Sequence, residues 1–223
     1  MTATTGDERL RDALLDLDAI TRRLRRECPW DRAQDERSIV PHTVEEAYEL
    51  ADAAHSGDDA KLLDELGDVL FQVYFLSLLL EERERGDLAM VATATRDKLV
   101  RRHPHIFGTD ALADLPTDAT TPSEVKENWD AIKEREPGDR AIAESLPALT
   151  YARKQLRRAP HAAEPAEALA KVAQARAHAP QDAHHGSDEL YEAVGDLLLA
   201  VVDVAADARV DPEIALRRKA AAL

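Results

Sequence analysis

Residues 69–80 are almost entirely apolar, and this segment constrains the fold more than any other part of the chain. Only Gln72 and Ser77 interrupt it. It lies within a longer stretch, 59–85, whose composition favours a helix that ends at Gly86. Because a helix that is apolar on every side must be covered on every side, the segment predicts either the centre of a helical bundle or a contact between subunits.

The remainder of the chain is also rich in helix formers, and runs of β-branched residues are scarce. Residues 8–26 carry leucines at helical spacing, which predicts an amphipathic helix that Cys28-Pro29-Trp30-Asp31 breaks. A second helix is expected to start near Pro41. The expected helices after the first are 43–55, 59–85, 87–102, 123–135, 147–158, 164–178 and 188–208, and the expected loops are 108–122 and 179–187. The sequence therefore predicts an all-α protein, a helical bundle.

The two halves of the chain are weakly similar to each other, which indicates a duplicated helical unit. Residues 64–70 read Asp-Glu-Leu-Gly-Asp-Val-Leu, and residues 192–198 read Glu-Ala-Val-Gly-Asp-Leu-Leu. Between the halves, the sequence Glu-Pro-Gly-Asp at 136–139 is typical of a linker. We therefore expect two domains, at 1–138 and 139–223.

The chain is strongly acidic, with 44 acidic and 29 basic residues and a formal net charge of −15. Most of this excess lies in residues 41–90, which hold 13 acidic and 3 basic residues. The charge argues against a nucleic-acid polymer as a partner, because phosphate backbones select basic surfaces. A protein that gathers acids in one segment and bases in others is suited to binding a metal ion and an anion together.

Several features bear on the compartment. The first residues lack a basic segment followed by an apolar one, so no secretory signal is expected. No apolar run reaches the about 18 residues of a membrane-spanning helix. Cys28 is the one cysteine, which excludes an internal disulfide bond and a multi-cysteine zinc site. We expect a cytoplasmic protein without a membrane partner.

Five acidic residues form the most informative pattern in the chain. They are arranged as Glu45-Glu46-x-x-Glu49 and Glu65-x-x-Asp68. Spacings of three and four residues place side chains on one face of a helix. The segment between the two sets, at 56–58, is a turn that lies midway between them. The second acid set is therefore expected to face the first across an antiparallel helix pair.

Four facing carboxylates would repel one another without a cation between them. The alternative is that these acids point to water and pair with Lys or Arg, but Arg37 and Lys61 are the only such residues between positions 33 and 82. Carboxylates that are buried need partners or metal ions. Because all-oxygen ligand sets select hard divalent ions, the pattern predicts a site for Mg²⁺ or Mn²⁺.

Four ordered motifs within residues 28–133 resemble the signature of the MazG-type all-α nucleoside triphosphate pyrophosphohydrolases. The first is Cys28-Pro29-Trp30-Asp31-x-x-Gln34, and the second is formed by the two acid sets just described. The third is Lys98-Leu99-Val100-Arg101-Arg102-His103-Pro104-His105-Ile106-Phe107-Gly108, and the fourth is Asn128-Trp129-x-x-Ile132-Lys133. The resemblance implies hydrolysis of a nucleoside or deoxynucleoside triphosphate to the monophosphate and pyrophosphate. It also implies a magnesium site at Glu46, Glu49, Glu65 and Asp68, with Glu45 orienting a ligand or a water.

The same resemblance implies that basic and aromatic residues bind the substrate. These residues are Lys98, Arg101, Arg102, Trp129 and Lys133. Alternatively, Lys98, Arg101 and Arg102 form a basic helix C-terminus, which the helix dipole favours. Trp129 either stacks on the base or fills the core, and the sequence leaves both interpretations open.

The second half has lost most of the acids that its repeat would require. The positions equivalent to the first acid set hold Gln174, Ala175 and His178, and Ala193 replaces the first acid of the second set. Only Asp196 remains, and we expect it to be buried without a partner. One carboxylate does not hold Mg²⁺ usefully, so 139–223 is interpreted as a degenerate structural repeat.

Three further interpretations stay open at this point. The substrate range could be narrow, such as phosphoribosyl-ATP or a pyrimidine deoxynucleotide. The chain could also be a non-catalytic helical module that dimerises. The apolar segment 69–80 predicts a homodimer, and packing of the two halves on each other is the competing arrangement.

Overall fold

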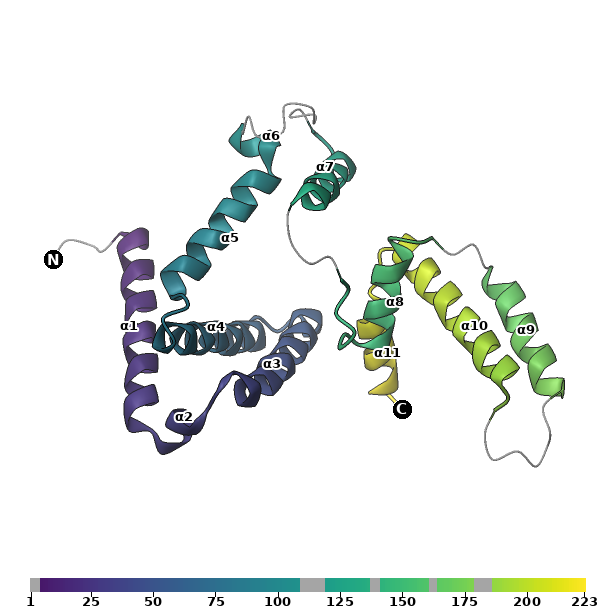
Figure 1. Cartoon of the computed structure of the whole chain (residues 1–223), viewed down its shortest axis with the longest axis horizontal. Helices are drawn as coiled ribbons and strands as arrows, with labels where there is room; N and C mark the ends of the chain where they lie inside the picture. The colour runs from purple at the N-terminus through teal and green to yellow at the C-terminus, as the bar shows by residue number, and fades with distance from the viewer. Residues whose placement is uncertain (1–4, 109–118, 137–140, 161–163, 179–185) are drawn as a thin grey trace. The chain divides into compact units, whose positions relative to one another are not determined.

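The computed structural model describes residues 5–108, 119–136, 141–160, 164–178 and 186–223, and Figure 1 shows its helices. Within these ranges every regular element is helical, from α1 to α11. The all-α prediction is therefore confirmed. None of the described helices combines the length and hydropathy needed to cross a membrane.

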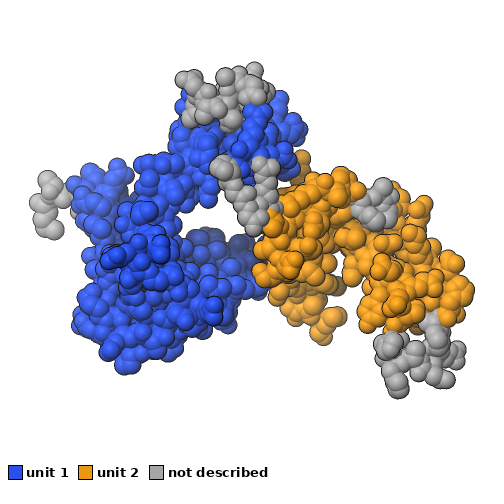
Figure 2. Space-filling view, viewed as in Figure 1, with its two compact units in different colours: residues 1–137 blue, residues 138–223 orange. Residues whose placement is uncertain are grey.

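The chain divides into two compact units, residues 1–137 and 138–223, which Figure 2 draws in blue and orange. The first unit holds α1 Gly6–Glu27, α2 Pro29–Ala33, α3 Glu36–Ser56, α4 Asp59–Glu82, α5 Leu88–Arg102, α6 Pro104–Phe107 and α7 Pro122–Arg135. The second holds α8 Ala148–Leu156, α9 Pro165–His178, α10 Asp188–Asp207 and α11 Pro212–Ala220. Most of the expected linker at 136–139, and most of the two expected loops, lie outside the described residues.

Two helix boundaries differ from those expected from the sequence. Residues 29–33, expected to be a break, form the short helix α2, because Pro29 occupies its first position and fixes a helical φ. Helix α3 begins at Glu36 rather than near 43, and Pro41 lies inside it. The Asp35 side chain accepts from the Ser38 backbone N–H at 2.8 Å, and the Asp35 N–H donates to the Ser38 hydroxyl at 2.9 Å. This capping box starts the helix early despite the N–H that Pro41 lacks.

Helices α3 and α4 form the hairpin on which the acidic residues lie. Gly57 has a φ of 72° and ends α3 in the left-handed conformation that favours glycine. The Asp58 side chain then caps α4 by accepting from the N–H groups of Ala60 and Lys61. The chain therefore reverses within two residues, which brings the acids of the two helices to one level.

The core of the first unit lies between α3 and α4. Ile39, Phe75 and Leu79 form its buried cluster, and Phe71 and Leu76 pack against it. Helix α1 covers the far end of α4, where the Tyr74 hydroxyl donates to the Leu14 carbonyl at 3.2 Å. The core therefore fastens α4 to α3, and α1 adds a second cover near the end of α4.

Helix α4 is not covered on every side, although its apolar run predicts that it should be. Leu63, Leu66, Leu70 and Val73 are all exposed in the described part of the first unit. Leu70 and Val73 belong to the apolar run, so the described part of the first unit does not by itself cover the run on every side. The alternative, a contact between subunits, stays a prediction.

The second unit is built around α10, which packs against α9 and α8. Small side chains are buried in this unit, among them Ala175 of α9 and Ala193 and Ala200 of α10. Arg153 of α8 forms an ion pair of 2.5 Å with Asp211, the residue that caps α11.

Candidate metal centre and substrate site

Three of the acids predicted from the sequence meet in the hairpin of the first unit. Glu46 and Glu49 come from α3, and Glu65 comes from α4. Each contributes a carboxylate oxygen, and these oxygens all lie within 4.8 Å of one another. The three residues thus form one acid cluster, in the helix-to-helix arrangement that their spacing predicts.

The electrostatics of the acid cluster show an excess of negative charge. Burial, followed by the charges of Asp68 and Glu49, raises the pKa of Glu46. Burial, followed by the charges of Glu49 and Asp68, raises the pKa of Glu65. The Glu65 Oε2 atom is buried and has no hydrogen-bond partner among the described residues. A cation between these oxygens would relieve both the repulsion and the missing partner.

The other two predicted acids lie at the margin of the acid cluster. Asp68 is exposed and lies outside the group of oxygens within 4.8 Å, but its charge acts on both Glu46 and Glu65. Glu45 is exposed as well, and its carboxylate lies 3.8 Å from the Nδ1 atom of His42.

The ligand chemistry of the acid cluster fits a hard divalent cation. Its potential ligands are carboxylate oxygens, which Mg²⁺ and Mn²⁺ prefer over nitrogen or sulfur. The buried Glu65 oxygen without a partner is what such an ion would satisfy. Glu46, Glu49 and Glu65 are placed to hold it, and Asp68 is close enough to add charge.

Thr43 and Gln72 form a polar pair that the sequence analysis did not predict, and Gln72 lies one helical turn after Asp68. Gln72 is buried, and the Thr43 hydroxyl lies 3.4 Å from its Oε1 atom. Gln72 follows Asp68 by four residues, so it faces α3 as Asp68 does. This spacing is the sequence signal that could have indicated Gln72.

The predicted substrate-binding residues gather on α5 and α7, whereas the acid cluster lies on α3 and α4. Arg101 donates to Glu136 Oε1 at 2.6 Å, and Arg102 forms a second ion pair with the same carboxylate. The Arg102 guanidinium also lies 5.1 Å from the centre of the Trp129 ring. The His103 ring lies edge-on to the Trp129 ring, with 5.0 Å between the two ring centres. These residues hold the end of α5 against α7.

This arrangement bears on the two interpretations of Trp129. The indole is half-buried, and Arg102 and His103 contact it. It therefore packs between helices in this structure and does not present a free ring. Lys98 and Lys133, by contrast, are exposed on α5 and α7.

The Glu136 ion pairs predict a pH-dependent stability. Hydrogen bonds from Arg102 and then Arg101 lower the pKa of Glu136 from 4.5 to about 2. A carboxylate with a lowered pKa stabilises the fold above its ordinary pKa, and this stability is lost as the pH falls toward about 2. At pH 7 we expect Glu136→Gln to lower the melting temperature by about 3–8 °C, the effect of about 1–2 kcal/mol.

Melting temperatures of the wild-type and Glu136→Gln proteins at several pH values test this. The difference should start to shrink below pH 4.5, where the carboxyl of the unfolded chain takes up a proton, and should vanish near pH 2, where the folded carboxyl does so too. Glu127→Gln is the matched control, since Glu127 is an exposed acid on α7, the helix that ends just before Glu136, and it should change little. A difference that is constant with pH contradicts the prediction.

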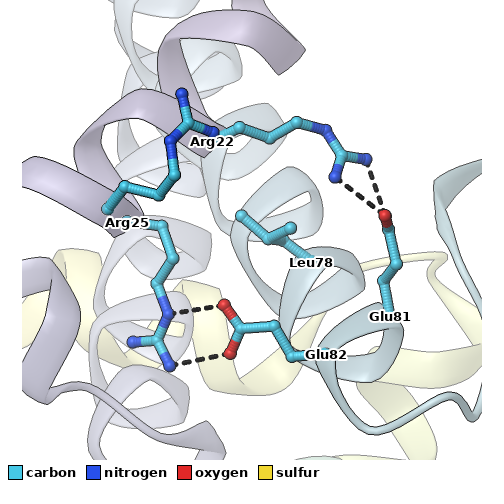
Figure 3. Close-up of a pocket in the computed structure, with 6 residues that line it drawn as sticks. Arg22, Arg25, Leu78, Glu81 and Glu82 are labelled. Carbon is cyan, nitrogen blue, oxygen red and sulfur yellow. Dashed lines mark hydrogen bonds and ion pairs between the residues drawn. The ribbon is translucent and has the colours of Figure 1, made fainter.

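A cavity of about 250 Å³ lies between α1 and α4, as Figure 3 shows. Two ion pairs line it: Arg22 donates to Glu81 at 2.6 Å, and Arg25 donates to Glu82 at 2.8 Å. Glu81 follows Glu65 by 16 residues on α4, a distance of about 24 Å along the helix. The ion pairs that line this cavity hold α1 against α4, and we interpret the cavity as separate from the acid cluster.

The second unit contains no counterpart of the acid cluster among its described residues. Ala175 and Ala193, at the positions of two of the acids, are buried in the packing of α9 and α10. Asp196 is half-buried, and its Oδ2 atom lies 3.5 Å from the Lys171 ammonium. The expectation that Asp196 has no partner is therefore wrong, because α9 supplies a lysine one turn before Ala175.

This pair changes the expected effect of removing Asp196. Replacement by alanine should leave turnover unchanged and lower the melting temperature by no more than about 4 °C, as for other partly exposed ion pairs. Lys171→Ala should have a similar effect, and the double variant should lose no more than either single one. A large loss of turnover with intact folding would place Asp196 in an active site.

Comparison with known proteins identifies the family. Residues 34–107 match the MazG nucleotide pyrophosphohydrolase domain, a range that contains the acid cluster and both arginines but ends before Trp129. The nucleoside triphosphate pyrophosphohydrolase of Escherichia coli (strain K12) is 35% identical over 205 residues, covering 86% of this chain and 75% of that protein.

Two further relatives agree with this result. The nucleoside triphosphate pyrophosphohydrolase/pyrophosphatase MazG of Thermotoga maritima is 32% identical over 203 residues, covering 86% of this chain and 74% of that protein. The nucleoside triphosphate pyrophosphohydrolase of Mycobacterium tuberculosis is 30% identical over 167 residues, covering 73% of this chain and 50% of that protein. The resemblance predicted from the motifs is confirmed, and the chain belongs to the MazG nucleotide pyrophosphohydrolase family.

Proposed function

We propose that this protein hydrolyses ribo- or deoxyribonucleoside triphosphates to the monophosphate and pyrophosphate, with Mg²⁺ as the metal ion and Mn²⁺ as a possible substitute. The names of the relatives support the reaction. The observation that carries the proposal is the acid cluster, in which three carboxylates meet and one buried oxygen has no described partner. The pools of such substrates are in the cytoplasm, which is the compartment we propose.

We assign the metal ligands to Glu46, Glu49, Glu65 and Asp68. These residues would hold the ion, which would supply activation of a water and screening of the phosphates for in-line attack at the α-phosphorus. Glu45 orients a ligand or a water from the margin of the acid cluster. Its exposed carboxylate is near His42 and is not needed for packing.

We assign substrate binding to the basic and aromatic residues of α5 and α7. These are Lys98, Arg101, Arg102, Trp129 and Lys133. A protein with a charge of −15 needs cations to attract a triphosphate, and the exposed lysines supply them in addition to the metal. Arg101 and Arg102 then exchange part of their bonding to Glu136 for bonding to phosphate, which suits their planar guanidinium groups.

We further propose that the second unit is a degenerate repeat with a structural role, and that the protein is a homodimer. The replacement of acids by Ala175 and Ala193 supports the first point. The uncovered apolar residues of α4 support the second, because large exposed apolar patches mark association sites.

Pyrophosphate release from a panel of ribo- and deoxyribonucleoside triphosphates, with and without Mg²⁺, tests the function. We expect release that requires the metal and yields the monophosphate. Activity on phosphoribosyl-ATP or one pyrimidine deoxynucleotide alone would identify a narrow-substrate enzyme. No release from any substrate, together with no Mg²⁺-dependent change in melting temperature, would contradict the proposal and favour a non-catalytic module.

A further inference from the structure

Trp30, on α2, is an exposed tryptophan whose backbone is held on both sides. The Gln34 side chain donates to the Trp30 carbonyl at 2.9 Å. The guanidinium of Arg25 donates to the carbonyls of Asp31 and Gln34. Asp31 is buried, whereas Trp30 is 52% exposed. The fold therefore fixes where the indole lies without covering it.

The indole lies next to the part of α3 that precedes the acid cluster. The ring centres of Trp30 and His42 are 6.0 Å apart, and the two planes meet at 62°, which is an edge-on contact. The Nδ1 atom of His42 in turn lies 3.8 Å from the Glu45 carboxylate, and both side chains are exposed. A continuous line of contacts therefore runs from Trp30 through His42 to Glu45.

His42 shares a helix face with the acids of α3. Glu46 follows it by four residues and Glu49 by seven, and these spacings place all three side chains on one face. The two glutamates lie about 6 Å and about 10 Å beyond His42 along the helix axis. The indole and the acid cluster thus lie toward opposite ends of one face. A nucleoside triphosphate has the matching layout, since its ribose separates an aromatic base from the charged phosphates.

The two ends of this face also differ in chemistry as the two ends of a nucleotide do. The carboxylates of the acid cluster suit a cation that accompanies phosphate, and an exposed indole suits an uncharged aromatic ring. The other tryptophan of the chain, Trp129, is half-buried and is contacted by Arg102 and His103. Of the two tryptophans, Trp30 is therefore the one whose ring is open to a base.

We propose that Trp30 is the platform on which the base of the substrate stacks, and that His42 is a positioning residue that holds the indole in place. The platform selects triphosphates that carry a base over inorganic tripolyphosphate. It accepts purines and pyrimidines alike, because every base has a face that can stack. Trp129 then serves the substrate through Arg102, whose guanidinium lies against it. The identity of the ligand rests on the proposed function, but the tests measure binding and not hydrolysis.

An α,β-methylene nucleoside triphosphate, which cannot be cleaved between its α- and β-phosphates, is the probe for the platform. Trp30→Leu should weaken its binding by a factor of about 10 to 100, the usual effect of losing one stacked base. Trp30→Phe keeps an aromatic face and should weaken it by a factor of about three or less. Inorganic tripolyphosphate is the matched ligand without a base, and both variants should bind it as the wild type does. Calorimetry with Mg²⁺ present measures each affinity, and circular dichroism verifies the fold.

His42→Ala tests the positioning role. We expect it to weaken binding of the analogue by a smaller factor than Trp30→Leu does, and to leave tripolyphosphate binding unchanged. In a Trp30→Leu background it should have no further effect, because His42 acts through the indole. An equal effect of His42→Ala in both backgrounds would overturn this role.

The fluorescence of Trp30 tests the stacking directly. Trp129→Phe leaves Trp30 as the one tryptophan of the chain, and saturation with the analogue, but not with tripolyphosphate, should quench its emission. An analogue that binds without quenching Trp30, or that binds Trp30→Leu as tightly as the wild type, overturns the platform and leaves the proposed reaction intact. Quenching without hydrolysis of any triphosphate supports the platform and contradicts the reaction. Failure of the wild type to bind the analogue contradicts both.

Discussion

Glu49→Gln should lower turnover by a factor of about 1,000 or more, while the protein stays folded. Glu49 contributes one of the three oxygens that lie within 4.8 Å of one another. A bound metal ion supplies several kcal/mol of charge stabilisation in such reactions, and each 1.36 kcal/mol is a factor of ten in rate. The apo variant should be at least as stable as the wild type, because the charge of Glu49 is among the causes of the raised pKa values of Glu46 and Glu65.

Two measurements separate this prediction from simple unfolding. Pyrophosphate release gives the turnover, and the melting temperature with and without Mg²⁺ gives the binding of the metal. The wild type should gain stability from Mg²⁺, and Glu49→Gln should gain little. Asp68→Asn should behave in the same way, although Asp68 lies at the margin of the acid cluster.

The matched control is Asp52→Asn, which removes one exposed carboxylate from the same helix. It should retain turnover within about a factor of two, because Asp52, three residues after Glu49, is not among the residues whose oxygens meet in the acid cluster. Wild-type turnover in Glu49→Gln or Asp68→Asn would contradict the assignment of the metal ligands.

Phe75→Ala should destabilise the first unit by about 3–5 kcal/mol. Phe75 is fully buried at the centre of the cluster with Ile39 and Leu79, and the guanidinium of Arg25 lies 5.8 Å from its ring centre. Its loss would leave a cavity between α3 and α4, the two helices that bring the acids together. We therefore expect weaker Mg²⁺ binding in this variant as well.

Urea unfolding, followed by circular dichroism, measures the change in the free energy of unfolding. Phe107→Ala is the control, since it makes the same substitution at an exposed position of the first unit and should cost less than about 1 kcal/mol. Equal unfolding midpoints for Phe75→Ala and the wild type would show that this cluster does not hold the hairpin together.

Helix periodicity and acid spacing were sufficient to predict much of this protein. The all-α fold follows from the composition and the apolar spacing, because these are local properties of a helix. The meeting of Glu46 and Glu49 with Glu65 also follows from local geometry, since a short turn at Gly57 leaves one way for the two helices to pair. Boundaries such as the start of α3 depended on the capping by Asp35 and Ser38, which outweighed the signal from Pro41.

Pairings between distant residues were decided by the tertiary structure. The sequence predicted that Arg101 and Arg102 bind substrate or form a basic helix end, and it gave them no partner. In the structure the carboxylate of Glu136, 34 residues after Arg102, engages both arginines. The sequence predicted that Asp196 is unpaired, but the packing of α9 against α10 places Lys171 beside it. The sequence by itself determined which residues share a helix face, because a helix has one period. Which face meets which partner depends on how helices pack, and only the tertiary structure decides that.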